Sequence, residues 1–134
     1  MALRISELVG VSEKLGVVLR AAGLNDSDKL LVAAGQPADR IELAQKLGIS
    51  ERALLELANR ADLARVKGIG RVYSDLLEFA GVDTVKELAG RNADNLFDRI
   101  RSVAGEHSVQ RIPRRDQVHD WVAQAKTLPR AIHY

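Results

Sequence analysis

Apolar residues recur along this chain three and four positions apart, which is the spacing of one face of an α-helix. The pattern is clearest in "LGVVLRAAG", "IELAQKLG", "ERALLELANRADL", "YSDLLEFAG" and "LFDRIRSVAG", and in the stretch that follows Pro113. No segment alternates apolar and polar residues for long enough to indicate a β-strand. The hydrophobic pattern therefore predicts an all-α fold.

Several residues mark where these helices should begin and end. The candidate left-handed glycines at helix C-termini are Gly23, Gly48, Gly81 and Gly105. Ser50 is placed to cap the helix that follows it, and Thr84 and Glu87 have the spacing of a capping box. Pro113 is expected in the first turn of the last helix, where its missing N–H group costs nothing.

Two stretches of the chain resemble each other at an offset of 58 residues. They are "VGVSEKLGVVLRAAGLNDSDKLL" (9–31) and "KGIGRVYSDLLEFAGVDTVKELA" (67–89). The alignment pairs Gly10 with Gly68 but Ser12 with Gly70, so only the second copy has two turn glycines. A small helix-turn-helix unit cannot bury its own apolar face, and two packed copies form the natural minimum.

We therefore expect one compact domain that covers residues 1–134. Its two repeat units are expected at about 5–48 and 62–105, with a linking helix at about 50–61 and a closing C-terminal helix at about 113–127.

The composition is that of a soluble globular protein, with 46% hydrophobic and 28% charged residues. The chain has no cysteine, which excludes disulfides, zinc knuckles and thiol catalysis. No apolar run is long enough to cross a bilayer, and the start "MALRISELVG" lacks the apolar core of a secretory signal. These features predict a cytoplasmic protein without a membrane partner.

The formal net charge is only +2, but the positive excess lies in the second half of the chain. Glu106 is the only acid between Arg99 and Arg115. Arg111, Arg114 and Arg115 bracket Ile112-Pro113, and guanidinium groups beside an ordered turn suit phosphate. The alternative is a solvated helix entrance, although a helix N-terminus does not favour cations.

The segment "LARVKGIGRVYSDLL" places two glycines between helical stretches and resembles the helix-hairpin-helix motif, a nonspecific nucleic-acid-binding element. In that motif the glycines expose backbone amides that meet a backbone phosphate at the next helix N-terminus. The resemblance implies a contact made by Lys67, Gly68, Ile69, Gly70 and Arg71. In the alternative interpretation the hairpin only packs, and the acidic side chains of Asp75 and Glu78 weaken the local positive field.

The remaining candidates do not indicate catalysis. Trp121 could stack on a base, but its helical spacing favours the core. His107, His119 and His133 lack metal-ligand spacing. No nucleophile, phosphate loop or carboxylate pair has a supporting context. We therefore expect no metal, no cofactor, no small-molecule substrate and no enzymatic activity.

Residues of about 5 to 128 are similar to the family catalogued as domain of unknown function 4332, on the segments "ADLARVKGIG", "AGVDTVKELA" and "WVAQAK". The resemblance implies a tandem helix-hairpin-helix fold and assigns no activity. Our first hypothesis is a non-catalytic, sequence-nonspecific nucleic-acid-binding module. The second is a protein-interaction or scaffold domain, which predicts an exposed apolar patch of residues such as Leu31, Val32 and Ile132.

Overall fold

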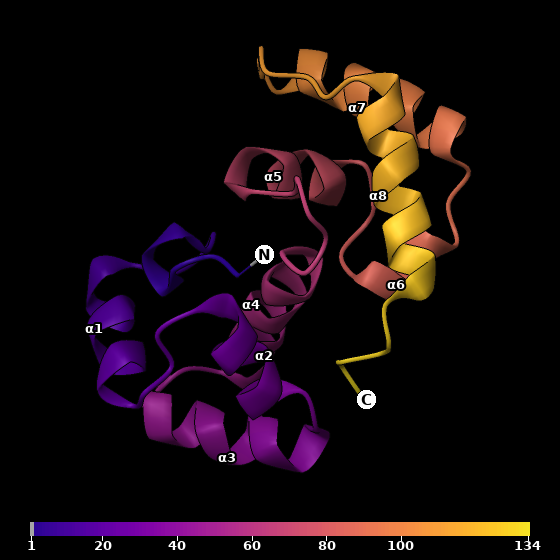
Figure 1. The fold of residues 1–134 in the computed structure, drawn as a ribbon. Helices are drawn as coiled ribbons and strands as arrows, with labels where there is room; N and C mark the ends of the chain where they lie inside the picture. The colour runs from indigo at the N-terminus through magenta and orange to yellow at the C-terminus, as the bar shows by residue number, and fades with distance from the viewer. Residues whose placement is uncertain (1) are drawn as a thin grey trace.

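The computed structural model describes residues 2–134, and its elements over this range are helical (Figure 1). The elements are the 3-10 helix η1 (Ile5–Glu7) and the α-helices α1 (Glu13–Ala21), α2 (Ser27–Ala34), α3 (Pro37–Leu47), α4 (Glu51–Leu63), α5 (Arg71–Phe79), α6 (Val85–Ala89), α7 (Ala93–Glu106) and α8 (Arg115–Thr127). Within residues 2–134, β pairing is limited to one isolated bridge between Arg4 and Asp26. The predicted all-α fold is confirmed.

The helices form two sets of four that follow one another along the chain. Helices α1 and α5 cover residues 58 positions apart at both ends, and α2 and α6 begin 58 positions apart. Helices α4 and α8 are each 13 residues long and start 64 positions apart. Helix α4 packs on α2 and α3, as α8 packs on α6 and α7. Helices α4 and α8 are therefore equivalent fourth helices, where the sequence suggested a linker and a separate closing helix.

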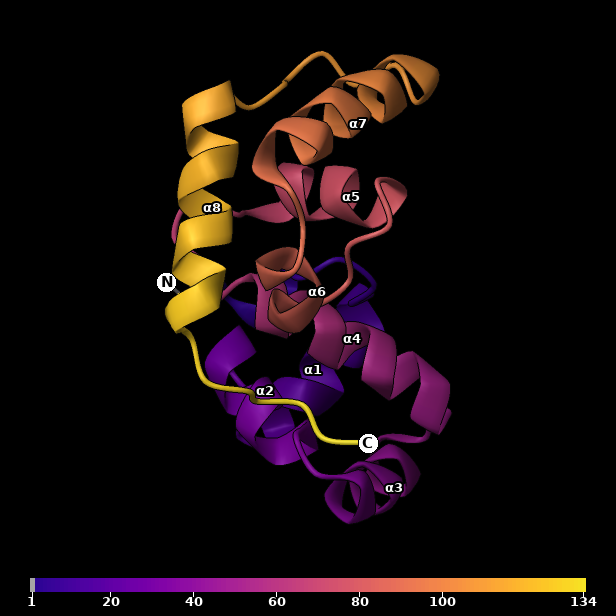
Figure 2. The same ribbon diagram turned by 90° about the vertical axis from the view of Figure 1, so that its right-hand side faces the viewer.

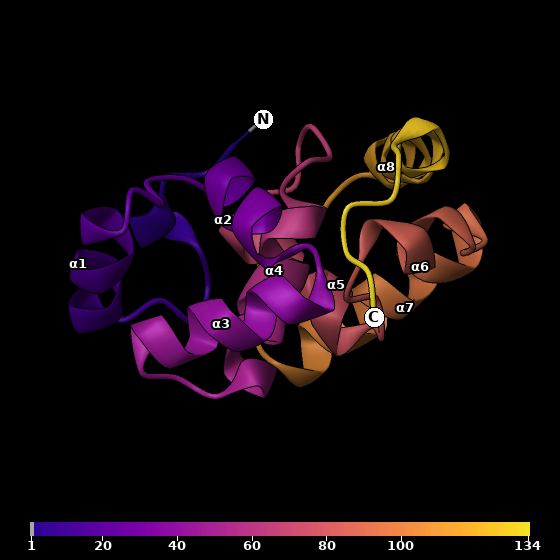
Figure 3. The same cartoon turned by 90° about the horizontal axis from the view of Figure 1, so that it is seen from below.

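Each set of four helices has its own hydrophobic core, and α4 contributes residues to both. Figure 3 shows α4 between α1, α2 and α3 on one side and the helices of the second set on the other. Leu57 and Ala58 of α4 belong to the N-terminal core, whereas Leu63, at its last turn, belongs to the C-terminal core. Trp121 is 1% exposed and lies within the C-terminal core, as its spacing predicted. The two halves are thus joined by a shared helix rather than by a flexible linker.

Most of the predicted helix ends are correct. Gly23, Gly48 and Gly81 have φ angles of 82°, 71° and 89°, which are left-handed as expected. Gly105 is different, because it lies inside α7 without a positive φ. Ser108 takes the left-handed conformation there instead, with a φ of 55°, and the N–H of Val109 donates to the carbonyl of Ala104 at 2.8 Å. This pairing closes the helix end in the same way as a glycine would.

The predicted helix starts hold at two positions and fail at one. The Oγ of Ser50 accepts a hydrogen bond from the N–H of Ala53, and the Oγ1 of Thr84 accepts one from the N–H of Glu87, which is one half of the predicted capping box. Helix α8 begins at Arg115 with Arg114 at its N-cap, so Pro113 precedes the helix. Pro113 is buried there rather than forming the first turn.

After α8 the chain crosses back to the N-terminal half (Figure 2). The N–H of His133 donates to the carbonyl of Gly35 at 2.7 Å, and the buried guanidinium of Arg40 donates to the carbonyl of His133. Ile132 is 4% exposed and completes the N-terminal core. We call residues 128–134 the C-terminal tail; it ties the two halves together.

The apolar patch expected for a scaffold domain is not formed by the residues named for it. Leu31 and Ile132 are buried, and only Val32 is exposed, at 82%. Leu31 of α2 and Ile132 of the C-terminal tail belong to the same N-terminal core, a long-range contact that the local pattern does not contain. Over residues 2–134, none of the helices is both long and apolar enough to span a membrane.

Candidate nucleic-acid interface

Residues 64–70, which we call the hairpin, connect α4 to α5. Three backbone hydrogen bonds of short sequence range form the turns of the hairpin. The N–H groups of Arg65, Val66 and Ile69 each donate to the carbonyl three residues earlier. The side chains of Val66 and Ile69 are 1% and 4% exposed and anchor the hairpin in the C-terminal core. Of the predicted contact residues, Ile69 can therefore offer only backbone atoms to a ligand.

Gly68 has a structural reason to be glycine. Its φ is +98°, a conformation that side chains rarely adopt. A Cβ atom added at this position would lie 3.0 Å from Nε1 of Trp121. The hairpin backbone thus rests on the indole of α8, and Gly68 serves packing whatever else it does.

Gly70 has no such constraint. A Cβ atom added there would meet nothing within 4 Å, and its φ of −101° is open to any residue. Gly70 is the N-cap of α5 and offers no side-chain acceptor to the first turn. In the first repeat, the Oγ of Ser12 fills the equivalent role and accepts from the N–H of Leu15 at 3.1 Å. The amides at the start of α5 therefore lack the side-chain cap that those of α1 have.

The hairpin is clamped to α8 by a side chain that the sequence did not indicate. Oε1 of Gln124 accepts from the N–H of Lys67 at 2.9 Å, and its Nε2 donates to the carbonyl of Lys67 at 3.1 Å. The amide group of Gln124 is oriented in turn by Asp120, whose Oδ2 accepts at 2.8 Å. No local motif marks a glutamine for this role, because its partner lies 57 residues away.

Two acidic side chains near the hairpin are paired with a cation, which the sequence did not indicate. Lys67 and Arg71 are both exposed. Asp75 and Glu78 do not face the hairpin freely, because Arg60 of α4 forms salt bridges with both. The guanidinium of Arg60 also donates to the Oγ of Ser74. The two acids are therefore engaged by a side chain that is only 14% exposed, which reduces their effect on an anion.

The three arginines of residues 111–115 do not form one cluster. The guanidinium carbon of Arg111 lies 5.1 Å above the ring of Tyr73, in the first turn of α5, and so extends the hairpin surface. Nε of Arg114 pairs with Asp116 at 3.1 Å. Only Arg111 of the three is therefore placed next to the hairpin without a carboxylate partner, within residues 2–134.

Arg115 turns toward α7 instead. Its guanidinium lies 2.8 Å from Asp94 and 4.6 Å above the ring of Phe97. Nε2 of His119 is also 2.8 Å from Oδ1 of Asp94. The hydrogen bonds from His119 and then Arg115 lower the pKa of the exposed Asp94 carboxyl from its ordinary value of 3.8. The side chains of Arg115 and His119 therefore lie on the flank of α8 away from Gln124.

The described residues 2–134 hold no group of three histidine or acidic side chains arranged to bind a metal ion. The hairpin presents uncapped backbone amides at the start of α5, the exposed side chains of Lys67 and Arg71, and Arg111 over the ring of Tyr73. These groups donate hydrogen bonds and positive charge, which suits a phosphate oxygen.

Comparison with curated proteins and with solved structures gives no match in either set. Residues 10–128 match the family described as "Domain of unknown function (DUF4332)". The match covers most of the 134 residues and includes the hairpin and both fourth helices, α4 and α8. The chain is a member of the DUF4332 family.

Proposed function

We propose that this protein is a non-catalytic, sequence-nonspecific nucleic-acid-binding module of the helix-hairpin-helix type, acting in the cytoplasm. The observation that carries the proposal is the contrast between Gly70 and Ser12. At equivalent helix starts, Ser12 closes the first turn with its hydroxyl, whereas Gly70 leaves the turn open and unobstructed. Packing explains Gly68, but it does not explain Gly70.

A phosphate group at the start of α5 would accept hydrogen bonds from the backbone amides of the first turn. The partial positive charge of the helix N-terminus favours an anion at that place. Lys67 and Arg71 add exposed positive charges on either side, and Arg111 adds one above the ring of Tyr73. We assign the main contact to the hairpin residues together with Arg111.

Arg114 and Arg115 would take part only by exchanging carboxylate partners for phosphate. Arg114 is paired with Asp116, and Arg115 is paired with Asp94. Such surface ion pairs contribute little free energy, so a phosphate can displace them at modest cost. We therefore assign these two arginines to a secondary contact.

The proposal is tested by fluorescence anisotropy with a short labelled duplex and a short labelled single strand, over about 50 to 200 mM salt. Affinity for duplex DNA should fall with a log–log slope near −0.9 for each phosphate contacted. The hairpin and Arg111 together predict a slope between about −1 and −3.

Gly70→Asp is the decisive variant, and Ser12→Asp is its matched control. Aspartate is a good N-cap, so both variants should stay folded, as checked by circular dichroism. The carboxylate at residue 70 would occupy the phosphate site, so Gly70→Asp should lose nucleic-acid binding while Ser12→Asp keeps it. If wild type does not bind at about 50 mM salt, or if both variants bind as wild type does, the open helix start is not a phosphate site.

The alternative function is a protein-interaction or scaffold domain whose hairpins only pack. Its expected surface is reduced to Val32, because Leu31 and Ile132 are core residues. Failure of the anisotropy experiment would favour this alternative and direct the search to protein partners.

A further inference from the structure

A groove of about 310 Å³ lies between the end of α4, α6, the end of α8 and the C-terminal tail. Its lining combines two kinds of side chain. Apolar lining residues are Val85, Ala89, Ala125, Leu128 and Ile132, and cationic ones are Arg65, Lys86, Lys126 and Arg130. A groove of this size is at the small end of the range found for ligand sites.

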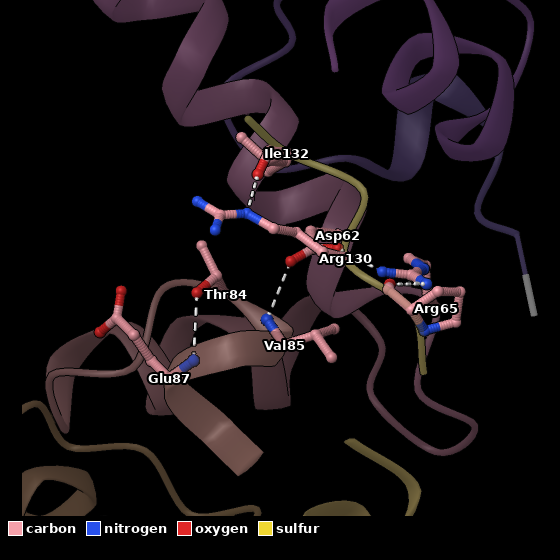
Figure 4. A network of polar contacts seen from close by, with 8 residues as sticks. Asp62, Arg65, Thr84, Val85, Glu87, Arg130 and Ile132 are labelled. Atoms are coloured by element: carbon pink, nitrogen blue, oxygen red, sulfur yellow. Dashed lines mark hydrogen bonds and ion pairs between the residues drawn. The ribbon is translucent and has the colours of Figure 1, made fainter. Parts of the chain in front are cut away.

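Cationic side chains outnumber acidic side chains at the groove. Among the described residues, Asp62 is the only one with an acidic side chain that lines the groove. Asp62 is 4% exposed, and its two oxygens are already used (Figure 4). Oδ1 accepts from Nη1 of Arg65 at 2.8 Å, and Oδ2 accepts from the N–H of Val85 at 2.9 Å. Asp62 therefore cancels Arg65 and leaves the other cations unopposed.

Those other cations have no carboxylate partners within residues 2–134. Lys86 and Lys126 are exposed and form no salt bridge there. Nε of Arg130 donates to the carbonyl of Ile132 at 2.8 Å, and its guanidinium lies 5.7 Å over the ring of Tyr134. This hydrogen bond directs Arg130 along the tail beside Thr84, at the edge of the groove (Figure 4).

We propose that the groove binds a small anionic amphiphile, with a carboxylate or phosphate-monoester head and a short apolar body. The head would lie among Lys86, Lys126 and Arg130, and the body would cover the apolar floor. A free inorganic anion would leave that floor exposed to water, and a neutral apolar molecule would leave the cations without a partner.

This proposal does not depend on the proposed nucleic-acid contact. Lys67 of the hairpin is held on the flank of α8 that carries Asp120 and Gln124, whereas Arg65, at the start of the hairpin, lines the groove and is paired with Asp62. Lys126 lies on the other flank, where it lines a surface hollow together with His119 and Arg91. A ligand in the groove and a phosphate at the start of α5 would therefore bind separately.

The test is a titration of the ¹⁵N-labelled full chain, followed by amide chemical shifts. The probes are octanoate and octyl phosphate. The controls are 1-octanol, which has the same apolar chain without a charge, and acetate, which has the carboxylate without the chain. At least one of the two anionic amphiphiles should shift the amides of Val85, Lys86, Ala125 and Lys126 saturably, and more than tenfold more tightly than octanol or acetate. Equal affinity for octanol, or shifts that do not saturate, would overturn the proposal.

Charge reversal at the groove provides the second arm. Lys126→Glu should weaken octanoate or octyl phosphate binding by about tenfold or more, because a charged hydrogen bond is lost and a repulsion is added. Lys46→Glu is the matched control, since both lysines lie in the last turn of their helices. Lys126→Gln serves as the milder variant if the reversal perturbs folding. An unchanged affinity in a folded Lys126 variant would contradict the assignment.

Discussion

Gly68 lies directly against Trp121, so that an added Cβ atom would be 3.0 Å from the indole nitrogen. Gly10 has the same relationship to Leu57, with a Cβ-to-Cδ2 distance of 3.1 Å. Both glycines have positive φ angles, and Leu57 and Trp121 occupy matching places on α4 and α8. In each half, the turn before the first helix is thus seated on the fourth helix.

We expect Gly68→Ala to lower the free energy of unfolding by about 2 kcal/mol or more, through left-handed strain and the clash with Trp121. Urea denaturation measures this loss. Gly105→Ala is the control, because Gly105 lies inside α7 with open space around it and should gain about 0.5–1 kcal/mol. A neutral Gly68→Ala would show that the hairpin is not seated on Trp121.

Gln124→Ala should loosen the hairpin locally. The variant removes both hydrogen bonds to the backbone of Lys67, at a cost of about 1 kcal/mol. Amide hydrogen exchange should become faster at Lys67 than in wild type. Gln45→Ala on the exposed face of α3 should leave that exchange rate unchanged. Equal rates at Lys67 in wild type and in Gln124→Ala would count against the clamp.

Asp62→Ala should be one of the more damaging single changes outside the apolar core. It leaves the buried N–H of Val85 without its acceptor and removes the charge partner of Arg65, whose side chain is 14% exposed. We expect a loss of about 3 kcal/mol in the free energy of unfolding. Glu42→Ala, which breaks an exposed pair with Lys46, should stay within about 0.5 kcal/mol of wild type in the same urea titration.

Because of the Asp94 carboxyl, the stability of the fold should depend on pH in the acidic range. Its pKa is lowered in the folded state, so its contribution to stability is present above the ordinary pKa of 3.8. That contribution is lost as the pH falls through the lower folded value. Thermal melts of wild type and Asp94→Asn should therefore differ at neutral pH and converge in strong acid. His119→Ala removes the hydrogen-bond donor to Asp94 and should move the Asp94 pKa, followed by carboxyl NMR, back toward 3.8. An unmoved pKa would exclude the hydrogen bond from His119 as its cause.

The local features of this fold follow from the amino-acid sequence alone. Apolar residues at helical spacing, the caps Ser50 and Thr84, and the left-handed glycines at 23, 48 and 81 depend on contacts within four or five residues. Such short-range physics is visible in a single sequence. Gly105 and Ser108 show the limit of the approach, because the left-handed residue at the end of α7 is not the glycine.

Helix packing sets which residues meet at the candidate sites. Only in the folded chain does Gln124 contact Lys67 and Asp75 pair with Arg60. Folding also directs Arg115 toward Asp94 of α7, away from the hairpin. It also folds the C-terminal tail over α2 and α6, which buries Ile132 and creates the groove. These contacts join residues far apart in the chain, and their partners depend on how whole helices pack rather than on any local pattern. The positions of the helices could therefore be predicted from the sequence, whereas the surfaces available for binding depend on how the helices pack.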